Sequence, residues 1–467
     1  MSFLKLQRHT HVPHTSQTGN ESQTILGEDP DLKLPKIASL VIVVLANLFL
    51  QMSFFIVISS SNAYANNLGG DSTFSGLIIG IPTVFSGLAL IPLLRYDRGG
   101  YSLPLHVSCA SSILGHILYA LAYRANFLYL ILIGRIVNGF GFTFWMYCKR
   151  YCSDPRIVGV RRRTTLAGLL VMGQGLGTSA GPFFGGLLYK IGFKNNVFNG
   201  FTSPAWIMAV VWCIFWVFVT LFYEEVPRDV SSVPTLSQTG ITSEGMDKEQ
   251  EIKEFGSMSP QISAEPQAFR FTPSQIGVMV CMCWFAMTCF FVLGAWEANL
   301  PVFGANTPQF HWSPFAAGNF IALGGITALP FLILNIFMAR RAEDRSILAF
   351  GSGLGLIALF IFLSLLKTGK INYGSVFICW WAVALGFNMA SSVTVSLLSK
   401  QLPPTWSKRN PVMIQYSMYI GRVTGAVWGG SGIRVGMLKY VGLEIALVGV
   451  GAVLYTTLWH KLKTKRG

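Results

Sequence analysis

Charged side chains are scarce in this 467-residue chain, where Asp, Glu, Lys and Arg together make up 12% of the residues. Soluble globular domains carry roughly 25%. The chain is also 52% hydrophobic, with a mean hydropathy of +0.51, which excludes an ordinary soluble domain. Repeated runs of about 20 apolar residues between short polar turns instead predict a helical protein that crosses the membrane many times.

Acidic residues are the scarcer sign of charge, with 20 Asp and Glu against 35 Lys and Arg and a formal net charge of +15. A basic excess can indicate nucleic-acid binding. Here the basic residues lie in short loops between apolar runs, which is the positive-inside pattern of a membrane protein. Nucleic acid is therefore not an expected partner.

Cysteine is absent from the loops that we assign to the outer side, so we expect no structural disulfides. Cys148 and Cys152 are four residues apart, and Cys281 and Cys283 are two apart, but no further ligands lie near either pair. A metal site needs such ligands. We expect packing thiols, no metal site and no cofactor.

Residues 1–36 lack the apolar core of a cleavable signal peptide and predict a disordered cytosolic tail. His9, His11 and His14 within it could bind a metal ion, although a disordered tail is the preferred interpretation. Glu21-Ser-Gln-Thr-Ile25-Leu26 resembles the acidic dileucine signal, through which sorting adaptors send membrane proteins to lysosomes or vacuoles.

The apolar runs divide the chain into two similar halves. A six-helix bundle is predicted over 37–224 and another over 274–461, with a disordered linker at 225–273 and a basic tail at 462–467. Basic residues concentrate in the loops on one side, so both termini and the linker are expected in the cytosol. The twelve predicted spans are 37–60, 74–94, 103–123, 127–151, 164–190, 204–224, 274–300, 315–339, 346–366, 371–398, 410–433 and 437–460.

Three motifs resemble signatures of the major facilitator superfamily, whose members have this twelve-helix architecture. Asp97-Arg98-Gly99-Gly100 matches half of the signature between the second and third helices and implies an ion pair at a helix end that favours one conformation. Arg135-x-x-x-Gly139-x-Gly141 resembles the signature of the fourth helix. The glycines between Gly181 and Gly186 resemble that of the fifth and predict close helix packing.

Apart from Glu224 at the last position of its span, only two acidic residues, Glu297 and Glu444, lie inside predicted spans. Glu444 is near the outer end of the last span, where it is expected to snorkel or cap. Glu297 is placed near the outer end of the seventh span. Two interpretations stay open for it: a proton-binding group or partner of an intramembrane arginine, and a gate salt bridge at the outer rim.

Four of the cations that lie inside predicted spans are candidate site residues: Arg135, Lys149, Arg150 and Arg422. Adjacent helical residues point about 100° apart, so Lys149 is expected to reach the cytosolic headgroups and Arg150 the central cavity. Arg150 and Arg422 come from different halves, as a site at the repeat interface requires. Arginines facing a wet cavity favour an anionic substrate, because the guanidinium fork binds two oxygens at once. Packing or interhelical pairing is the alternative.

Several stretches resemble the transporter part of plant SPX–MFS proteins, which are vacuolar phosphate transporters. Tyr64 falls where that family has tyrosine, which implies a place in the substrate site. Arg150, Glu297 and Arg422 are also shared with a related lysosomal branch that is tied to ceroid lipofuscinosis and associated with anion conduction. The similar stretches are Lys149–Asp154, Asn196–Asn199, Pro204–Trp212, Glu343–Leu348, Val395–Lys400 and Gly421–Val423.

Two departures limit this resemblance. Only 36 residues precede the first span, so we expect no SPX sensor domain and no regulation by inositol polyphosphates through it. Lys149 also stands where an arginine is common, which weakens a bidentate contact there.

The sequence therefore predicts a vacuolar or lysosomal membrane transporter, rather than one of the plasma membrane, that moves an inorganic anion, with phosphate first. Arg150, Arg422, Lys149 and Tyr64 would bind the substrate, and Glu297, Arg135, Asp97 and Arg98 would couple protons or gate. An anion channel, or a carrier for an amino acid or sugar, is the alternative. An enzyme is not expected, because the histidines inside spans, His106 and His116, stand alone.

Overall fold

The computed structural model describes residues 32–96, 99–226, 272–338, 342–402 and 409–463, which form helices and no strands. The first half contains α1 (Ile37–Phe55), α2 (Ile58–Asn67), α3 (Ser72–Arg95), α4 (Ser102–Ala125), α5 (Leu128–Phe142), α6 (Phe144–Tyr151), a 3-10 turn (Val160–Arg162), α7 (Arg163–Ile191) and α8 (Ser203–Phe222). The second contains α9 (Pro273–Asn306), α10 (Pro314–Met338), α11 (Asp344–Thr368), α12 (Tyr373–Ser392), α13 (Thr394–Gln401), α14 (Asn410–Val435) and α15 (Met437–Leu458).

These helices occupy the twelve predicted spans, and three of the spans are broken in two. The first is interrupted at 56–57, the fourth at Thr143 and the tenth at Val393. Each break falls at a β-branched residue, a type that fits a helix poorly. Ten of the spans are long and apolar enough to cross a membrane. The other two, α7 and α14, are rich in glycine, which adds little hydropathy.

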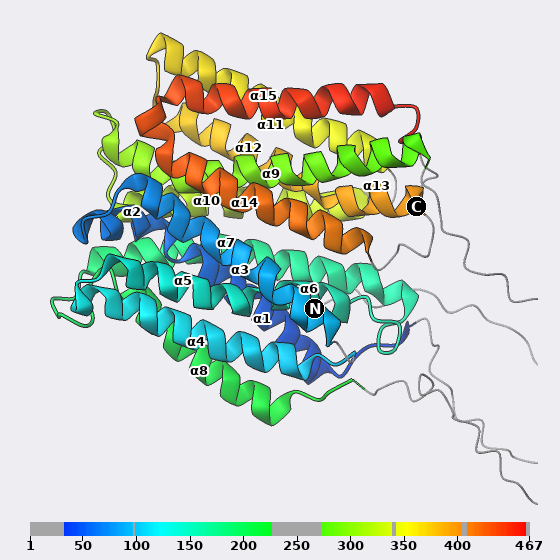
Figure 1. Cartoon of the computed structure of the whole chain (residues 1–467), viewed down its shortest axis with the longest axis horizontal. Coiled ribbons are helices and arrows are strands. Elements are labelled where there is room, and N and C mark those ends of the chain that lie inside the picture. Colours follow the sequence, from blue (N-terminus) through cyan, green and yellow to red (C-terminus); the bar gives the residue numbers. More distant parts are fainter. Residues whose placement is uncertain (1–31, 97–98, 227–271, 339–341, 403–408, 464–467) are drawn as a thin grey trace, which may run out of the picture.

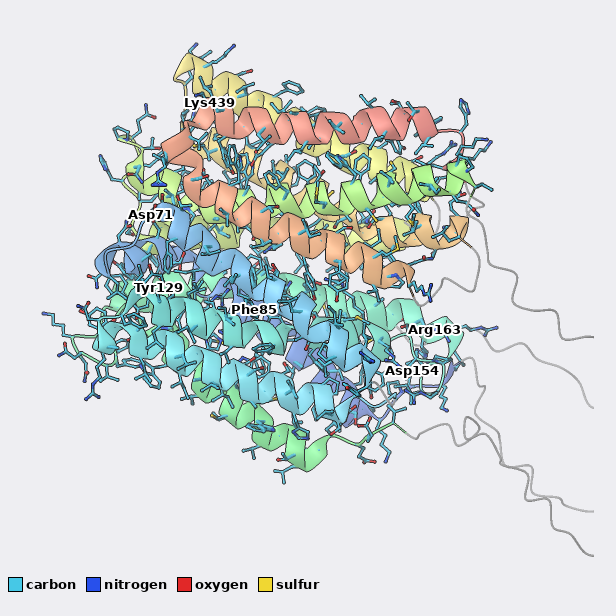
Figure 2. The ribbon with its side chains drawn as sticks, in the orientation of Figure 1. Asp71, Phe85, Tyr129, Asp154, Arg163 and Lys439 are labelled. Atoms are coloured by element: carbon cyan, nitrogen blue, oxygen red, sulfur yellow. The ribbon has the colours of Figure 1, made fainter. Side chains whose placement is uncertain are left out.

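The two halves form two layers, α1–α8 and α9–α15, that meet along α3 with α14 and along α7 with α10 (Figure 1). We call the side of the bundle where α1 begins and α15 ends the near side, and the opposite side the far side. Asp154 and Asp71 lie at the near and far ends of the first half (Figure 2). The predicted sites at Glu21–Leu26, at His9, His11 and His14, and at Asp97 and Arg98 lie outside the described residues, as does most of 225–273.

A stripe of glycines on α14 brings this helix into backbone contact with α9. A Cβ atom added to Gly421 would lie 2.0 Å from the carbonyl oxygen of Met287, and one on Gly425 would lie 2.0 Å from that of Phe291. A Cβ atom on Gly429 would lie 2.1 Å from the carbonyl oxygen of Ala295. The four-residue spacing places all three glycines on one helix face, and it fixes the positions of the charged residues that α9 and α14 carry.

The substitution Gly425→Ala is expected to destabilise the protein by about 1–3 kcal/mol, because the added methyl group would push α14 away from α9. A matched control is Gly442→Ala on α15, where an added Cβ meets nothing within 4 Å. Thermal unfolding of the two variants in detergent measures the difference. Equal melting temperatures would show that the stripe does not set this contact.

The predicted close packing of the fifth span is confirmed. A Cβ on Gly181 would lie 2.7 Å from Phe55, and one on Gly185 would lie 1.9 Å from the carbonyl oxygen of Ile56. The α7 glycines therefore pack against the break between α1 and α2.

Candidate functional site

An ion pair links α9 and α14 in the middle of the second half. Arg422 Nη2 donates to Glu297 Oε2 at 2.5 Å, and the two residues are 7% and 4% exposed. Arg422 lies near the midpoint of α14, so the pair is deep in the bundle. Of the two interpretations of Glu297, the partner of an intramembrane arginine agrees with this geometry, and the gate at the outer rim does not.

Glu297 lies deeper than predicted because its helix extends beyond residue 300, the predicted end of the span. α9 continues through Pro301 to Asn306, which leaves more than two turns beyond the carboxylate. Proline lacks only its own N–H, and membrane helices tolerate it where neighbouring groups satisfy the freed carbonyl.

Aromatic rings surround the guanidinium of Arg422. Its Cζ atom lies 4.9 Å from the ring centre of Phe54, 5.3 Å from that of Phe55 and 5.9 Å from that of Phe290. Cation–π attraction from such rings helps to hold a desolvated cation. Phe54 and Phe55 belong to the first half, so the second half's arginine reaches across the interface between the halves.

Arg135 is completely buried on α5 and holds the end of α1. Its Nε donates to the carbonyl oxygen of Ile78 at 3.1 Å, and its Nη atoms donate to those of Ser53 and Phe54 at 3.4 Å. Within the described ranges, no carboxylate pairs with it. The negative end of the α1 dipole and the carbonyls freed at the break take the place of a counter-ion.

Phe54 connects the two arginines, because the Arg135 Cζ atom lies 5.4 Å from the same ring centre that Arg422 approaches at 4.9 Å. One cation comes from each half, and the ring stands at the end of the broken helix α1. Sequence reasoning missed this residue, since nothing distinguishes it among 35 phenylalanines. Its position just before the Ile56-Val57-Ile58 run was the only available signal.

Lys149 and Arg150 differ in exposure and in their neighbours. The Lys149 side chain is exposed. It has no hydrogen-bond or ion-pair partner among the described residues. Arg150 is half-buried and lies against Tyr101 instead, with its Cζ atom 5.8 Å from the ring centre.

Tyr101 belongs to a network that ties the near ends of α4 and α6 together. Its hydroxyl donates to Asp154 Oδ2 at 2.7 Å, and Arg156 Nη2 donates to the same oxygen at 2.6 Å. Burial would raise the pKa of Asp154, but the hydrogen bonds from Arg156 and Tyr101 outweigh it and hold the pKa below its usual value. Arg156 Nη2 also donates to the carbonyl oxygen of Gly99 at 2.7 Å, beside the predicted Asp97–Arg98 motif.

Tyr64 is enclosed by packing contacts in this conformation. It is fully buried near the far end of the first half, where its hydroxyl donates to the carbonyl oxygen of Tyr119 at 3.2 Å and its ring stacks on Phe201. These are packing contacts, and the substrate contact of Tyr64 stays a prediction. Glu444 differs from its prediction too, because it is 0% exposed and neither snorkels nor caps.

Residues 43–426 match the Major Facilitator Superfamily. The chain belongs to this family. It is 33% identical over 460 residues to an uncharacterised MFS-type transporter of Schizosaccharomyces pombe. The match covers 96% of this chain and 87% of that protein. An SPX domain-containing membrane protein of Arabidopsis thaliana is 28% identical over 337 residues, or 65% of this chain and 46% of the plant protein, so the chain spans about half of its length.

Solved structures share the fold of this major facilitator protein. A D-xylose–proton symporter has a TM-score of 0.69 at 14% identity, covering 92% of this chain and 98% of that one. A bacterial homologue of the human lysosomal transporter Spinster, in an inward-facing and occupied conformation, has a TM-score of 0.65 at 14% identity and the same coverage. The chain is thus a twelve-helix secondary transporter rather than an enzyme.

In major facilitator proteins the two bundles rock about a fixed central site, and here they are joined at the far side. Arg434 Nη2 at the end of α14 pairs with Asp71 Oδ2 at the start of α3, at 3.3 Å. Lys190 Nζ on α7 lies 4.4 Å from the ring centre of Phe315 on α10. At the near side, the described parts of α6 and α13 make no substantial contact. These contacts hold the two halves together at the far side.

Proposed function

We propose that the protein carries an inorganic anion together with a proton, with phosphate as the first candidate. The observation that supports this most is the arrangement around Phe54, where Arg422 with its partner Glu297 meets Arg135 of the other half. Net positive charge at the interface of two rocking bundles suits an anion that both halves contact in turn.

Glu297 and a substrate anion compete for the same guanidinium. While Glu297 is charged, it occupies part of the fork of Arg422. A proton on Glu297 removes its charge and releases the fork, which then binds two oxygens of a phosphate. Loss of that proton restores the ion pair and expels the anion. Binding of the proton and binding of the anion therefore favour each other.

Lys149 on α6 is an exposed cation whose side chain has no hydrogen-bond or ion-pair partner among the described residues. An unpaired ammonium raises the local concentration of anions, so we propose that it attracts substrate toward Arg422. Arg150, placed against Tyr101, is proposed to act on the near-side network and on the field of the cavity.

The near side is proposed to be cytosolic and the membrane vacuolar or lysosomal. The basic loops support the orientation, and the resemblance to SPX–MFS transporters and the Glu21–Leu26 motif support the membrane. A fluorescent fusion located at the plasma membrane in yeast, and unmoved by Glu21→Ala, would overturn the assignment of the membrane.

The test of the substrate is uptake of labelled phosphate by liposomes that hold the purified protein, with and without a pH gradient. Saturable uptake that responds to the gradient supports the proposal. Uptake of chloride or organic anions in place of phosphate would move the substrate to another anion. Single-channel currents would show that the protein is an anion channel. Uptake of an amino acid or sugar in place of an anion would overturn the proposal that the substrate is an anion.

The substitution Glu297→Gln is expected to uncouple phosphate transport from proton binding. Glutamine has the shape of the protonated carboxyl group, so Arg422 stays available and phosphate exchange continues, while the response to the pH gradient falls at least tenfold. Exchange and gradient-driven uptake are measured in the same liposomes. Gradient-driven uptake equal to that of the unmodified protein would remove Glu297 from the coupling.

A further inference from the structure

A second buried carboxylate, Glu444, accepts a hydrogen bond from the residue that precedes Glu297 and has no part in the ion pair. It sits seven residues from the start of α15, about 10 Å from the far end of that helix at 1.5 Å per residue, and it is 0% exposed. Trp296 Nε1 on α9 donates to Glu444 Oε2 at 3.0 Å. The residue that follows Trp296 is Glu297.

The groups that face Glu444 are neutral. From its own helix the phenol of Tyr440, one turn earlier, approaches the carboxylate. From α9 it meets the Trp296 indole, which packs on Phe362 of α11 at 4.9 Å between ring centres. From α14, the indole of Trp428 donates to the backbone carbonyl of Tyr440 at 3.3 Å.

Charged groups on the helices packed against α15 are paired or lie at helix ends. Arg422 of α14 is bound to Glu297 of α9, and Arg434 is exposed and bound to Asp71. On α11, Asp344 and Arg345 lie at the near end and the exposed Lys367 lies at the far end. Across the described part of the chain, no Lys, Arg or His forms an ion pair with Glu444.

An isolated carboxylate in such a place is costly when charged. Burial of an unpaired charge costs several kcal/mol even after relaxation, and one indole N–H with one phenol offsets only part of it. A proton on the carboxylate removes this cost. Glu297 is different, because Arg422 stabilises its charged form. Two carboxylates in opposite environments are a pattern that divides proton roles between them.

We propose that Glu444 is a second proton-binding site of the transporter, loaded from the far side and coupled to the Glu297–Arg422 pair through Trp296. Trp296 and Glu297 are consecutive residues of one helix, so a movement of α9 that separates Glu297 from Arg422 also moves the indole away from Glu444. The carboxylate then loses its donor and retains its proton more firmly. This inference rests on the proposed function for its role in transport, but the binding of the proton can be tested by itself.

The indole of Trp296 is a built-in probe of Glu444, since charge on the carboxylate alters the environment of the ring that donates to it. Intrinsic fluorescence of the purified protein is titrated with pH in the absence of substrate, and the titration of Trp296→Phe is subtracted to isolate this residue. We expect a pH-dependent step that Glu297→Gln retains and Glu444→Gln abolishes. A step that is absent, or that persists unchanged in Glu444→Gln, would overturn the proposal.

The glutamine variant keeps an oxygen that accepts from Trp296 and is expected to fold, which its melting temperature checks. If it does not fold, Glu444→Asp and Tyr440→Phe replace it. Each alters the groups around the carboxylate, so a shifted midpoint of the fluorescence step supports the proposal and an unshifted midpoint contradicts it.

Transport measurements separate this inference from the proposed function. Glu444→Gln is expected to keep phosphate exchange and to reduce the number of protons taken up per phosphate, measured with a pH-sensitive dye inside the liposomes. A Glu444-dependent fluorescence step in a protein that transports neither phosphate nor another anion would overturn the proposed function and leave the proton site. Phosphate uptake with an unchanged proton count in Glu444→Gln would overturn the coupling role assigned to Glu444.

Discussion

Arg422→Ala is expected to reduce phosphate uptake at least 100-fold. The guanidinium fork would give the anion two charge-assisted hydrogen bonds, each worth about 1.5–3 kcal/mol, and 1.4 kcal/mol corresponds to a factor of ten in affinity. Arg422→Lys keeps the charge but loses the fork, so its phosphate uptake is expected to lie between that of the unmodified protein and that of Arg422→Ala. Phosphate binding to the purified protein, followed by uptake in liposomes, measures both effects.

A loss of folding has to be separated from this loss of binding. Removing Arg422 leaves Glu297 buried and unpaired, which is strongly destabilising by itself. The double variant Arg422→Ala/Glu297→Gln removes both charges and is expected to recover the melting temperature but not the transport. Lys439 is an exposed cation at the far end of α15 (Figure 2), and Lys439→Ala should change neither the melting temperature nor the transport. Recovery of transport in the double variant would show that Arg422 only neutralises Glu297.

Arg150→Ala is a useful comparison, because the sequence predicts the same substrate-binding role for Arg150 and Arg422. Contact with Tyr101 places Arg150 in the near-side network, so we expect a smaller loss of uptake than from Arg422→Ala. Equal losses of uptake in Arg150→Ala and Arg422→Ala would support a place for Arg150 in the substrate site.

The fold could be predicted from the sequence because the bilayer simplifies the problem. Apolar runs of a set length and basic loops on one side suffice to give twelve spans and their order. Charges inside spans, such as Glu297 and Arg422, stand out for the same reason. Their environment was harder to predict. Glu444 was expected at the membrane surface from its distance along the helix, whereas the indole of Trp296, 148 residues earlier, holds it inside.

Contacts between distant residues explain what the sequence left open. Arg422 and Glu297 are 125 residues apart, and only the packing of the α14 glycines on α9 brings them together. The same holds for Phe54, whose place between two arginines depends on a break in α1 that the apolar pattern does not show. The role of each of these residues thus depends on residues that lie far away in the sequence.

Arg135→Ala is expected to lower the free energy of unfolding by about 3 kcal/mol and to abolish phosphate uptake. The change leaves the carbonyl groups of Ile78, Ser53 and Phe54 without their donor and opens a cavity in the core of the first half. Each buried polar group left unpaired costs about 1–3 kcal/mol, and loss of the unpaired cation offsets part of the total. Thermal unfolding in detergent and uptake in liposomes are measured on the same preparation.

The variants of Arg135 distinguish a structural role from an electrostatic one. Arg124→Ala, at an exposed arginine in the last turn of α4, is the matched control and should change stability by less than about 0.5 kcal/mol. Arg135→Met fills most of the volume without charge or donors, and Arg135→Lys keeps the charge with fewer donors. If Arg135 acts by holding the end of α1, and with it the Phe54 ring, both variants lose stability and transport together. If it acts through its charge on the anion, Arg135→Lys transports normally, and the break in α1 is then held by the packing of α7 alone.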